Sequence, residues 1–339
     1  MIGSAEAAAL VRSAIDAQPR PDILQGLTRE SAEKMLSLAV QGGLLSEAIV
    51  SSTRGPPAIE DDPRAIVQRL LDAGRLTTWQ CEHLLVGRYK GFFHGRYKLL
   101  EHLDFGESSS VFLGEHVTLG TRWTLVMRGP LYLSNPSAMA WLERRLRVVA
   151  PMDHVNIVRI HDAETDGRMI HYLVREYVDG CNLAALLNHA VRLSPRLAAA
   201  LTLQIAEAAA YADSQNCPLP TIEAENVLVS RDGLVKVQPA HISLGYRQNS
   251  RIDDQSNGMA SGFPPGDVES LGQLLFQLLT GCLPMESNVI EHDLNTLRPA
   301  PPDWLKNICL RAVRVSGQKP LPTAADVCQA LRQGGARSD

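Results

Sequence analysis

The sequence has 339 residues, of which 45% are hydrophobic and 21% charged, and its formal net charge is -4. A chain of this length can bury a large core and hold two or three domains. The composition excludes a disordered protein, and the slightly acidic balance argues against nucleic acid or an anionic membrane as a partner.

The sequence also lacks targeting and cross-linking signals. No apolar run approaches the roughly 20 residues that a membrane span requires, and the first residues lack the charged and apolar regions of a secretory signal. The six cysteines include no CxxC pair, so neither a zinc site nor a disulfide framework is indicated. These patterns predict a cytoplasmic protein with reduced thiols.

Residues 1–90 are predicted to form a small all-α helical module. Apolar side chains recur at helical spacing in 33–41 and 63–73, and each stretch ends in glycine, which favours a left-handed turn. The segment Thr77-Thr78-Trp79-Gln80 has the form of a capping box for a further helix. We therefore expect a helix-turn-helix unit that occurs twice, with residues 51–57 as the linker.

The second helix of each unit is expected at residues 47–51 and 79–85. These segments carry almost no Lys or Arg, whereas a helix that reads DNA needs basic residues. The charge pattern therefore favours packing or contact with a protein over DNA binding.

Strand patterns begin near residue 95. The segments 96–103 and 111–115 are predicted strands that flank a loop whose one glycine is Gly106. A third strand is predicted over 122–128, and side chains alternate along a strand, so Thr124 and Val126 share a face.

The carboxyl-terminal half is predicted to be mainly helical. A serine followed by a proline at 194–195 indicates the start of a helix that continues to about residue 213. The residues 227–237 form two β-branched runs joined by an Asp-Gly turn, which is typical of a hairpin. A helix that is apolar nearly all round is expected over 267–281, and two amphipathic helices over 304–331.

Residues 95–333 resemble the protein-kinase family, in particular bacterial Ser/Thr kinases. The hinge segment 171–180, the His-x-Asn-Ile-Val motif at 154–158, the Asn-containing hairpin at 225–237 and the helix at 267–281 are similar to that family. The resemblance implies an α+β bilobal fold in which the helical module of residues 1–90 precedes a β-rich small lobe with hinge at 95–180 and a helical large lobe at 181–335.

The resemblance also implies that the catalytic groups have been replaced. Val126 stands where the family has the lysine that binds the α- and β-phosphates, and Arg145 stands where that lysine's glutamate partner is expected. Thr221 replaces the catalytic aspartate, Glu223 replaces the lysine that follows it, and Pro239 replaces the metal-binding aspartate. No residue is therefore expected to be catalytic.

Two residues keep the family's identity. Asn226 is the one retained candidate for a metal ligand, although an Asn at such a bend also serves as a partner for backbone groups. Asp267 matches an acid that bonds the catalytic-loop backbone, so a structural role is expected. The vestigial nucleotide cleft that the resemblance implies consists of Gly106, Thr124, Arg175, Glu176, Val178 and Leu228.

The preferred hypothesis is a pseudokinase that binds another protein, of unknown identity, as a signalling scaffold or regulator. It needs no cofactor and implies neither nucleic acid nor a membrane span. One alternative is an active Ser/Thr kinase that uses ATP and Mg²⁺ with displaced residues, namely Arg128, Asn226 and either Glu223 or Glu225.

A second alternative is a nucleotide- or anion-binding switch without catalysis. Arg175 is the gatekeeper in the resemblance, and a buried unpaired guanidinium is costly. We expect it either to pair with an acid at the surface or to form an anion site with Arg145.

Overall fold

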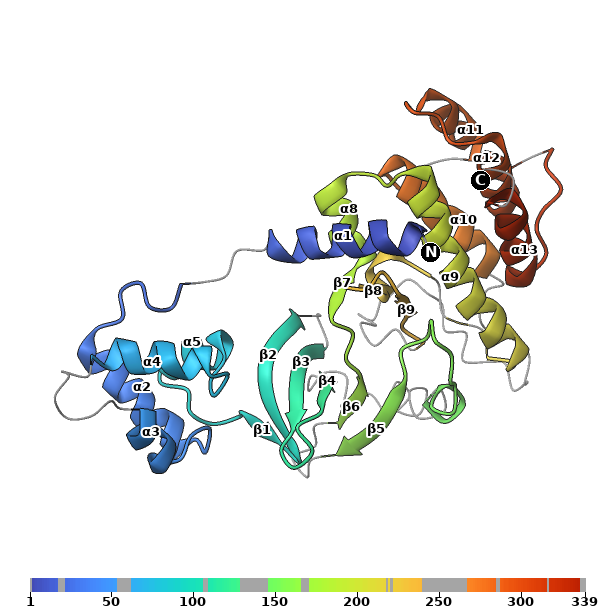
Figure 1. Ribbon diagram of the computed structural model, residues 1–339. Coiled ribbons are helices and arrows are strands. Elements are labelled where there is room, and N and C mark those ends of the chain that lie inside the picture. The colour runs from blue at the N-terminus through green and yellow to red at the C-terminus, as the bar shows by residue number, and fades with distance from the viewer. Residues whose placement is uncertain are drawn as a thin grey trace. The chain divides into compact units, whose positions relative to one another are not determined.

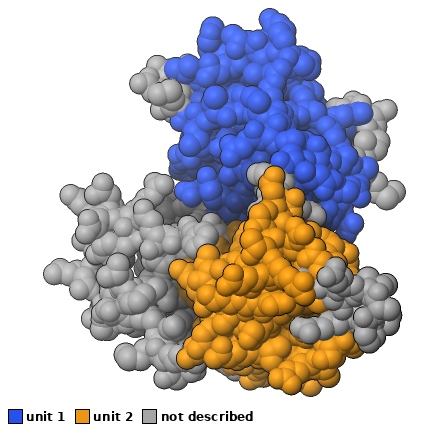
Figure 2. Space-filling view, turned by 90° about the vertical axis from the view of Figure 1, so that its left-hand side faces the viewer, with its two compact units in different colours: residues 1–18, 140–160, 178–339 blue, residues 19–139, 161–177 orange. Residues whose placement is uncertain are grey.

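The computed structural model folds into two compact units, coloured blue (unit 1) and orange (unit 2) in Figure 2. Unit 1 comprises residues 1–18, 140–160 and 178–339, and unit 2 comprises residues 19–139 and 161–177. The residues that the structure describes are 2–17, 22–53, 62–105, 109–128, 146–165, 171–217, 219, 222–239, 267–284, 287–315 and 317–335. Within these ranges, no helix has the length and apolar character to cross a membrane.

Unit 2 begins with four helices from the stretch 1–90 that was predicted as a helical module, whereas residues 1–18 of that stretch belong to unit 1. The four helices of unit 2, called the helical module below, are α2 (Arg29–Gln41), α3 (Glu47–Thr53), α4 (Pro63–Asp72) and α5 (Thr78–Leu85). The capping box is confirmed, because Thr77 Oγ1 accepts from the Gln80 backbone N–H at 3.2 Å while Gln80 Oε1 accepts from the Thr77 N–H at 3.0 Å. The predicted left-handed turns are also confirmed at Gly43 and Gly74, with φ of 74° and 62°.

The linker predicted at residues 51–57 begins too early, because α3 continues to Thr53. The hydroxyls of Ser52 and Thr53 both donate to the Ile49 carbonyl, at 3.0 and 2.7 Å. These bonds hold the two polar side chains against the last helical turn. Hydroxyl residues, which usually indicate a loop, therefore extend the helix here.

A six-stranded sheet completes unit 2, with the order β1-β2-β3-β4-β6-β5. Its strands are β1 (Phe93–His94), β2 (Tyr97–Phe105), β3 (Ser109–His116), β4 (Arg122–Arg128), β5 (Ile160–Thr165) and β6 (His171–Glu176). The strands β1 to β4 pair antiparallel with their neighbours, and β4 pairs antiparallel with β6. The three strands predicted between residues 96 and 128 are therefore confirmed, with ends that shift by a few residues.

The helical module packs against one face of this sheet. Trp79 of α5 meets Phe92 and Phe112 edge to face, with ring centroids 5.7 and 5.8 Å apart. The fully buried Gln80 donates to the Leu99 carbonyl of β2 at 2.6 Å. The core of this face consists of Tyr97, Leu99, Leu125, Met127, Tyr172 and Val174.

Unit 1 is mainly helical (Figure 1). Its helices are α1 (Ile2–Asp16), α8 (Leu183–Ala190), α9 (Pro195–Ser214), α10 (Asp267–Thr280), α11 (Ser287–Thr296), α12 (Asp303–Ala312) and α13 (Ala324–Gly335). The predicted start of α9 is confirmed, because Ser194 Oγ accepts from the Leu197 N–H at 3.2 Å. The helices predicted at the carboxyl-terminal end are confirmed as α10, α12 and α13.

A three-stranded ribbon lies beside these helices in unit 1, with the order β7-β8-β9. Its parts are β7 (Gly180–Asn182), the short 3₁₀ turn η1 (Ala224–Asn226), β8 (Val227–Ser230) and β9 (Val235–Val237). The predicted hairpin is confirmed, since β8 pairs antiparallel with β9 and Gly233 takes the positive φ of 79° that its turn requires. This ribbon holds the loop that contains Asn226.

Candidate functional site

The position of the expected phosphate-binding lysine lies in the middle of β4. Val126 is 1% exposed and stands directly opposite Val111 of β3 and Leu173 of β6. Residues paired directly across strands place their side chains on the same face of a sheet. The cross-strand neighbours of Val126 are therefore apolar, and none of them supplies a cation or a carboxylate.

Thr124 and Arg175 are brought together on this same face. They are register partners across β4 and β6, and they are only 4% and 8% exposed. Arg175 is therefore buried and not at the surface, where one of the two expectations placed it. Its position in β6, paired directly with Thr124 of β4, accounts for this burial.

The remaining positions of the expected cleft divide between the units. Glu176 is half-buried opposite Trp123 in unit 2, whereas Val178 and Leu228 are half-buried in unit 1. Gly106 lies outside the described residues. The same holds for Arg145, the expected second half of an anion site with Arg175, and for the side chain of Arg128.

Asn226 is engaged in the structure of its own loop. It is 2% exposed, and its Oδ1 accepts from the Glu223 backbone N–H at 3.0 Å, which closes the η1 turn. Its carbonyl accepts from the Gln238 N–H at 3.0 Å, which ties the turn to the end of β9. These contacts give Asn226 the role of a partner for backbone groups that its position at the bend suggested.

The other replaced positions of unit 1 offer little to a nucleotide. Glu223 is exposed, so its carboxylate is solvated and negative where the family has a lysine. Pro239 is buried, and a proline side chain carries no oxygen for a metal ion. Thr221 and the side chain of Asp267 lie outside the described residues, although Asp267 does begin α10.

Sequence reasoning missed a buried polar network that fixes this ribbon. Asn156 Nδ2 donates to the Val235 carbonyl at 2.9 Å and to Gln204 Oε1 at 3.1 Å. Gln204 Oε1 also accepts from the Val235 N–H at 2.9 Å. The motif at 154–158 contains Asn156, but no pattern marks Gln204, whose partner is 31 residues away.

The neighbouring His154 is part of the same region of unit 1. Its ring stacks on Tyr211, with centroids 4.9 Å apart, and its Nδ1 lies 3.1 Å from the Asn156 backbone nitrogen. Burial lowers the pKa of His154 below its ordinary value, because the charged imidazolium loses hydration. These contacts fit a neutral His154 ring that holds residues 154–156 in position, and they do not indicate a proton donor.

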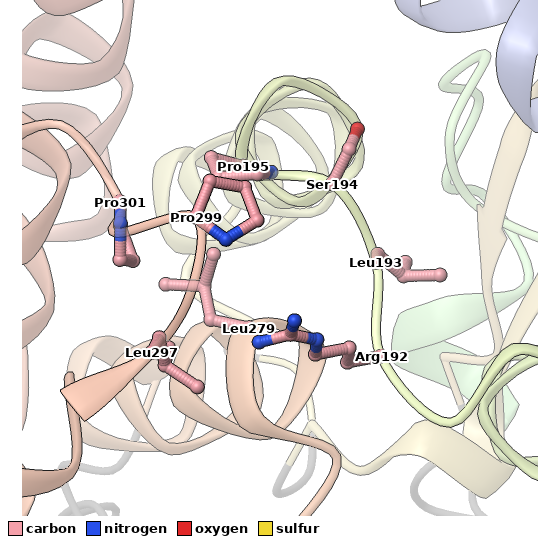
Figure 3. Close-up of a pocket in the computed structure, with 8 residues that line it drawn as sticks. All are labelled: Arg192, Leu193, Ser194, Pro195, Leu279, Leu297, Pro299 and Pro301. Carbon is pink, nitrogen blue, oxygen red and sulfur yellow. The ribbon is translucent and has the colours of Figure 1, made fainter.

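A cavity of about 190 Å³ in unit 1 lies between the start of α9 and the end of α10, apart from the Asn226 loop (Figure 3). Leu279, Leu297 and three prolines contribute to its wall, together with Arg192. The guanidinium of Arg192 donates to the Arg298 carbonyl, so it already has a partner. The Ser194 hydroxyl of the wall is likewise engaged, with the Leu197 N–H and Glu6, and the residues that line the cavity include no His, Cys, Asp or Glu.

The six cysteines are all free thiols. Burial raises the pKa of Cys81 and of Cys309 to about 12. Because the thiolate is the reactive form, these two buried thiols are poor nucleophiles near neutral pH. Covalent catalysis by them is not supported.

Two described residues at expected ligand positions lack the groups that would hold ATP and Mg²⁺. Val126 supplies no cation for the phosphates, and Pro239 supplies no carboxylate for the metal. Asn226 Oδ1 is occupied by a backbone N–H. Across the part of the chain that the structure describes, no three His, Cys, Asp or Glu side chains gather in a way that could hold a metal ion.

Comparison with known proteins gives one consistent family. The family described as protein tyrosine and serine/threonine kinase matches residues 98–261. The chain is 27% identical over 247 residues to a probable serine/threonine-protein kinase PknB of Lactococcus lactis, a match that covers 65% of this chain. It is 26% identical over 259 residues to the serine/threonine-protein kinase PrkC of Bacillus subtilis, over 69% of this chain. The matched part is 39% of each relative's length.

Solved structures agree on the fold. The crystal structure of the Mycobacterium tuberculosis PknI kinase domain matches with a TM-score of 0.56 and 16% identity, covering 72% of this chain and 97% of that domain. The predicted α+β kinase-like fold, preceded by helices, is confirmed by this likeness. Residues 98–261 thus match the model of protein tyrosine and serine/threonine kinases, and the chain is similar to bacterial serine/threonine protein kinases in sequence and to a kinase domain in fold.

Proposed function

We propose that this kinase-like protein does not transfer phosphate and acts in signalling through contacts with another protein. The observation that carries the proposal is Val126, a valine that is 1% exposed and has apolar neighbours on both adjacent strands. Phosphoryl transfer depends on charges placed around the phosphates. Val126 supplies none at this position.

The other replacements act in the same direction. Pro239 removes the carboxylate that would hold Mg²⁺, and Thr221 removes the group that would accept the substrate proton. Loss of one group that stabilises a transition state lowers kcat by about 10² to 10³. Several such losses together leave no measurable transfer.

Hydrogen bonds that stabilise the fold around the replaced positions of unit 1 are present. The side chain of Asn226 closes its turn through a hydrogen bond from the Glu223 N–H, and the side chain of Asn156 donates to the Val235 carbonyl of β9. A chain that keeps its scaffold while it lacks catalytic groups is suited to present surfaces to a partner protein. The proposal places the protein in the cytoplasm, where free thiols stay reduced.

A second candidate function is the binding of an anion or nucleotide without catalysis. The observation in its favour is the pair of Thr124 and Arg175, a hydroxyl and a guanidinium that are both buried and are opposite each other across two strands. Such a pair can bind an anion by charge-assisted hydrogen bonds. Arg175→Met keeps the side-chain length and removes the charge, so it isolates this role.

The test is a thermal-shift titration of the full chain with ATP, with and without Mg²⁺. A ligand at a hundredfold excess over its dissociation constant stabilises a protein by about 2.7 kcal/mol. The proposal predicts no shift in either condition. A shift without Mg²⁺ that Arg175→Met abolishes supports the second candidate, whereas a shift that requires Mg²⁺ supports an active kinase.

A further inference from the structure

The first helix, α1, belongs to unit 1 although residues 19–139 belong to unit 2. It lies against α8, α9, β7 and β8, and Figure 1 shows it in dark blue beside these elements. Four of its side chains are buried and share one face of the helix, since they follow the spacing i, i+1, i+4 and i+7. They are Ala7, Ala8, Val11 and Ala14.

Polar contacts at both ends fix the direction and register of α1. In its first turns, Ser4 Oγ donates to the Asp232 carbonyl at 2.9 Å, and Glu6 Oε1 accepts from Ser194 Oγ at 2.7 Å. In its last turn, Ser13 Oγ lies 3.0 Å from Nε2 of His189, within hydrogen-bond distance. A helix held at both ends by side-chain bonds occupies a defined site rather than a general apolar surface.

The surface is also shaped to admit a helix backbone. A Cβ at Gly233 would lie 2.2 Å from the Ser4 carbonyl oxygen and 3.1 Å from the Ala7 Cβ. The turn of the β8–β9 hairpin therefore needs a glycine for its own positive φ and also for the close approach of α1. The hairpin and α9, whose first turn contacts Glu6 through Ser194, form two walls of one site.

The fully buried side chains of α1 are small among the residues whose side chains are described. Within residues 4–16 they are three alanines and one valine, with Leu10 and Ile15 half-buried, whereas α9 buries Leu197, Leu201 and Ile205 among others. Hydrophobic stabilisation scales with the apolar area removed from water. The packing of α1 therefore contributes less stabilisation than that of α9. We expect α1 to detach at a free energy lower than that of global unfolding.

We propose that the surface formed by α8, α9 and the β7–β9 ribbon is a helix-docking site, and that α1 is its releasable occupant in cis. The site selects a helix with small residues at i, i+1, i+4 and i+7, a hydroxyl in its first turn and a carboxylate that meets Ser194. This inference does not depend on whether the chain transfers phosphate.

A pair of adjacent substitutions tests the proposal on the full chain. Ala8 is 5% exposed in the docked helix, whereas Ala9 is exposed, so Ala8→Glu places a carboxylate in the contact and Ala9→Glu places the same group in solvent. The probe is a fluorescent synthetic peptide with the sequence of residues 1–17, and binding is followed by fluorescence anisotropy. A docked cis helix competes at an effective concentration near the millimolar range.

The expected result is that the peptide binds the Ala8→Glu chain at least tenfold more tightly than the unmodified chain or the Ala9→Glu chain. A peptide that itself carries Ala8→Glu should bind none of them. Hydrogen exchange of the unmodified chain provides a second measurement, in which the amides of α1 should exchange at least tenfold faster than those of the α9 core.

Three outcomes would overturn the proposal. The first is equal peptide binding by the Ala8→Glu and Ala9→Glu chains. The second is exchange in α1 as slow as in α9, because α1 would then open only when the whole unit unfolds. The third is an Ala8→Glu chain that fails to fold, because a releasable occupant is not required for folding of unit 1.

Discussion

Substitution of Val126 by lysine restores the family's residue and should destabilise this chain. Val126 is 1% exposed, and its partners across the strands are Val111 and Leu173. Burial without a carboxylate lowers the pKa of an ammonium by about 3 to 5 units. At pH 7 the cost comes from the interval between pH 7 and the unfolded pKa near 10.4, at about 1.4 kcal/mol per unit, so we expect the free energy of unfolding to fall by about 4 to 5 kcal/mol.

The pH dependence identifies the charge as the cause. The folded pKa of the introduced lysine lies below its unfolded value near 10.4, so the unfolded chain binds more protons between these two pKa values. The cost is therefore complete below the folded pKa and disappears as the pH rises past about 10. Val126→Met, which has a similar length and no charge, should show only the packing cost of about 1 to 3 kcal/mol at every pH.

The assay is urea denaturation of both variants and the unmodified chain at pH 7 and pH 9.5, followed by circular dichroism. The reasoning predicts a lower midpoint for Val126→Lys than for Val126→Met at pH 7, and a smaller gap at pH 9.5. Equal midpoints at pH 7 would refute this prediction. They would mean that a nearby carboxylate forms an ion pair with the introduced ammonium, as in an active kinase.

Three further predictions concern the scaffold of unit 1. Asn156→Ala leaves the Val235 carbonyl without its side-chain donor and should lower the free energy of unfolding by about 1 to 3 kcal/mol in urea denaturation. Gly272→Ala places a Cβ 2.7 Å from the Ala312 Cβ and should cost about 1 to 3 kcal/mol in the same assay. His154, whose pKa burial lowers, stabilises the fold fully above its unfolded value near 6.5 and less as the pH falls through that value. His154→Gln should therefore weaken the loss of stability between pH 7.5 and pH 5.5.

Matched variants separate these effects from general damage. Gly335→Ala adds a methyl group where no atom lies within 4 Å, so it should leave the midpoint nearly unchanged. A cost for Gly335→Ala equal to that of Gly272→Ala would contradict the packing argument. If the stability of His154→Gln depends on pH as strongly as that of the unmodified chain, other groups cause the loss of stability at low pH.

Local features were predictable because neighbouring residues determine them. The Asp232-Gly233 turn fixes the β8–β9 hairpin, and Ser194 before Pro195 fixes the start of α9. The capping box at Thr77 is likewise a contact over three residues. The replaced positions, such as Val126, follow from the resemblance to kinases, and the structure adds that Val126 and Pro239 are buried and Glu223 is exposed.

Contacts between distant segments were not predictable from the sequence. The face of α1 is made of alanines, which favour a helix but indicate no partner, so its place in unit 1 has no sequence signal. Gln204 is one of several polar residues of α9, and only the fold brings it to Asn156 and Val235. The burial of Arg175 follows from the register of β6 against β4, which short patterns do not determine.

Transfer of the γ-phosphoryl group from labelled ATP tests the central claim most directly. The full chain and its Asn226→Ala variant are incubated with Mg²⁺ and with Mn²⁺, alone and with a generic acceptor protein. The account predicts that neither chain incorporates label above a sample without protein. Metal-dependent labelling by the unmodified chain that Asn226→Ala abolishes would contradict it, since that loss would assign the activity to this chain and not to a contaminating kinase.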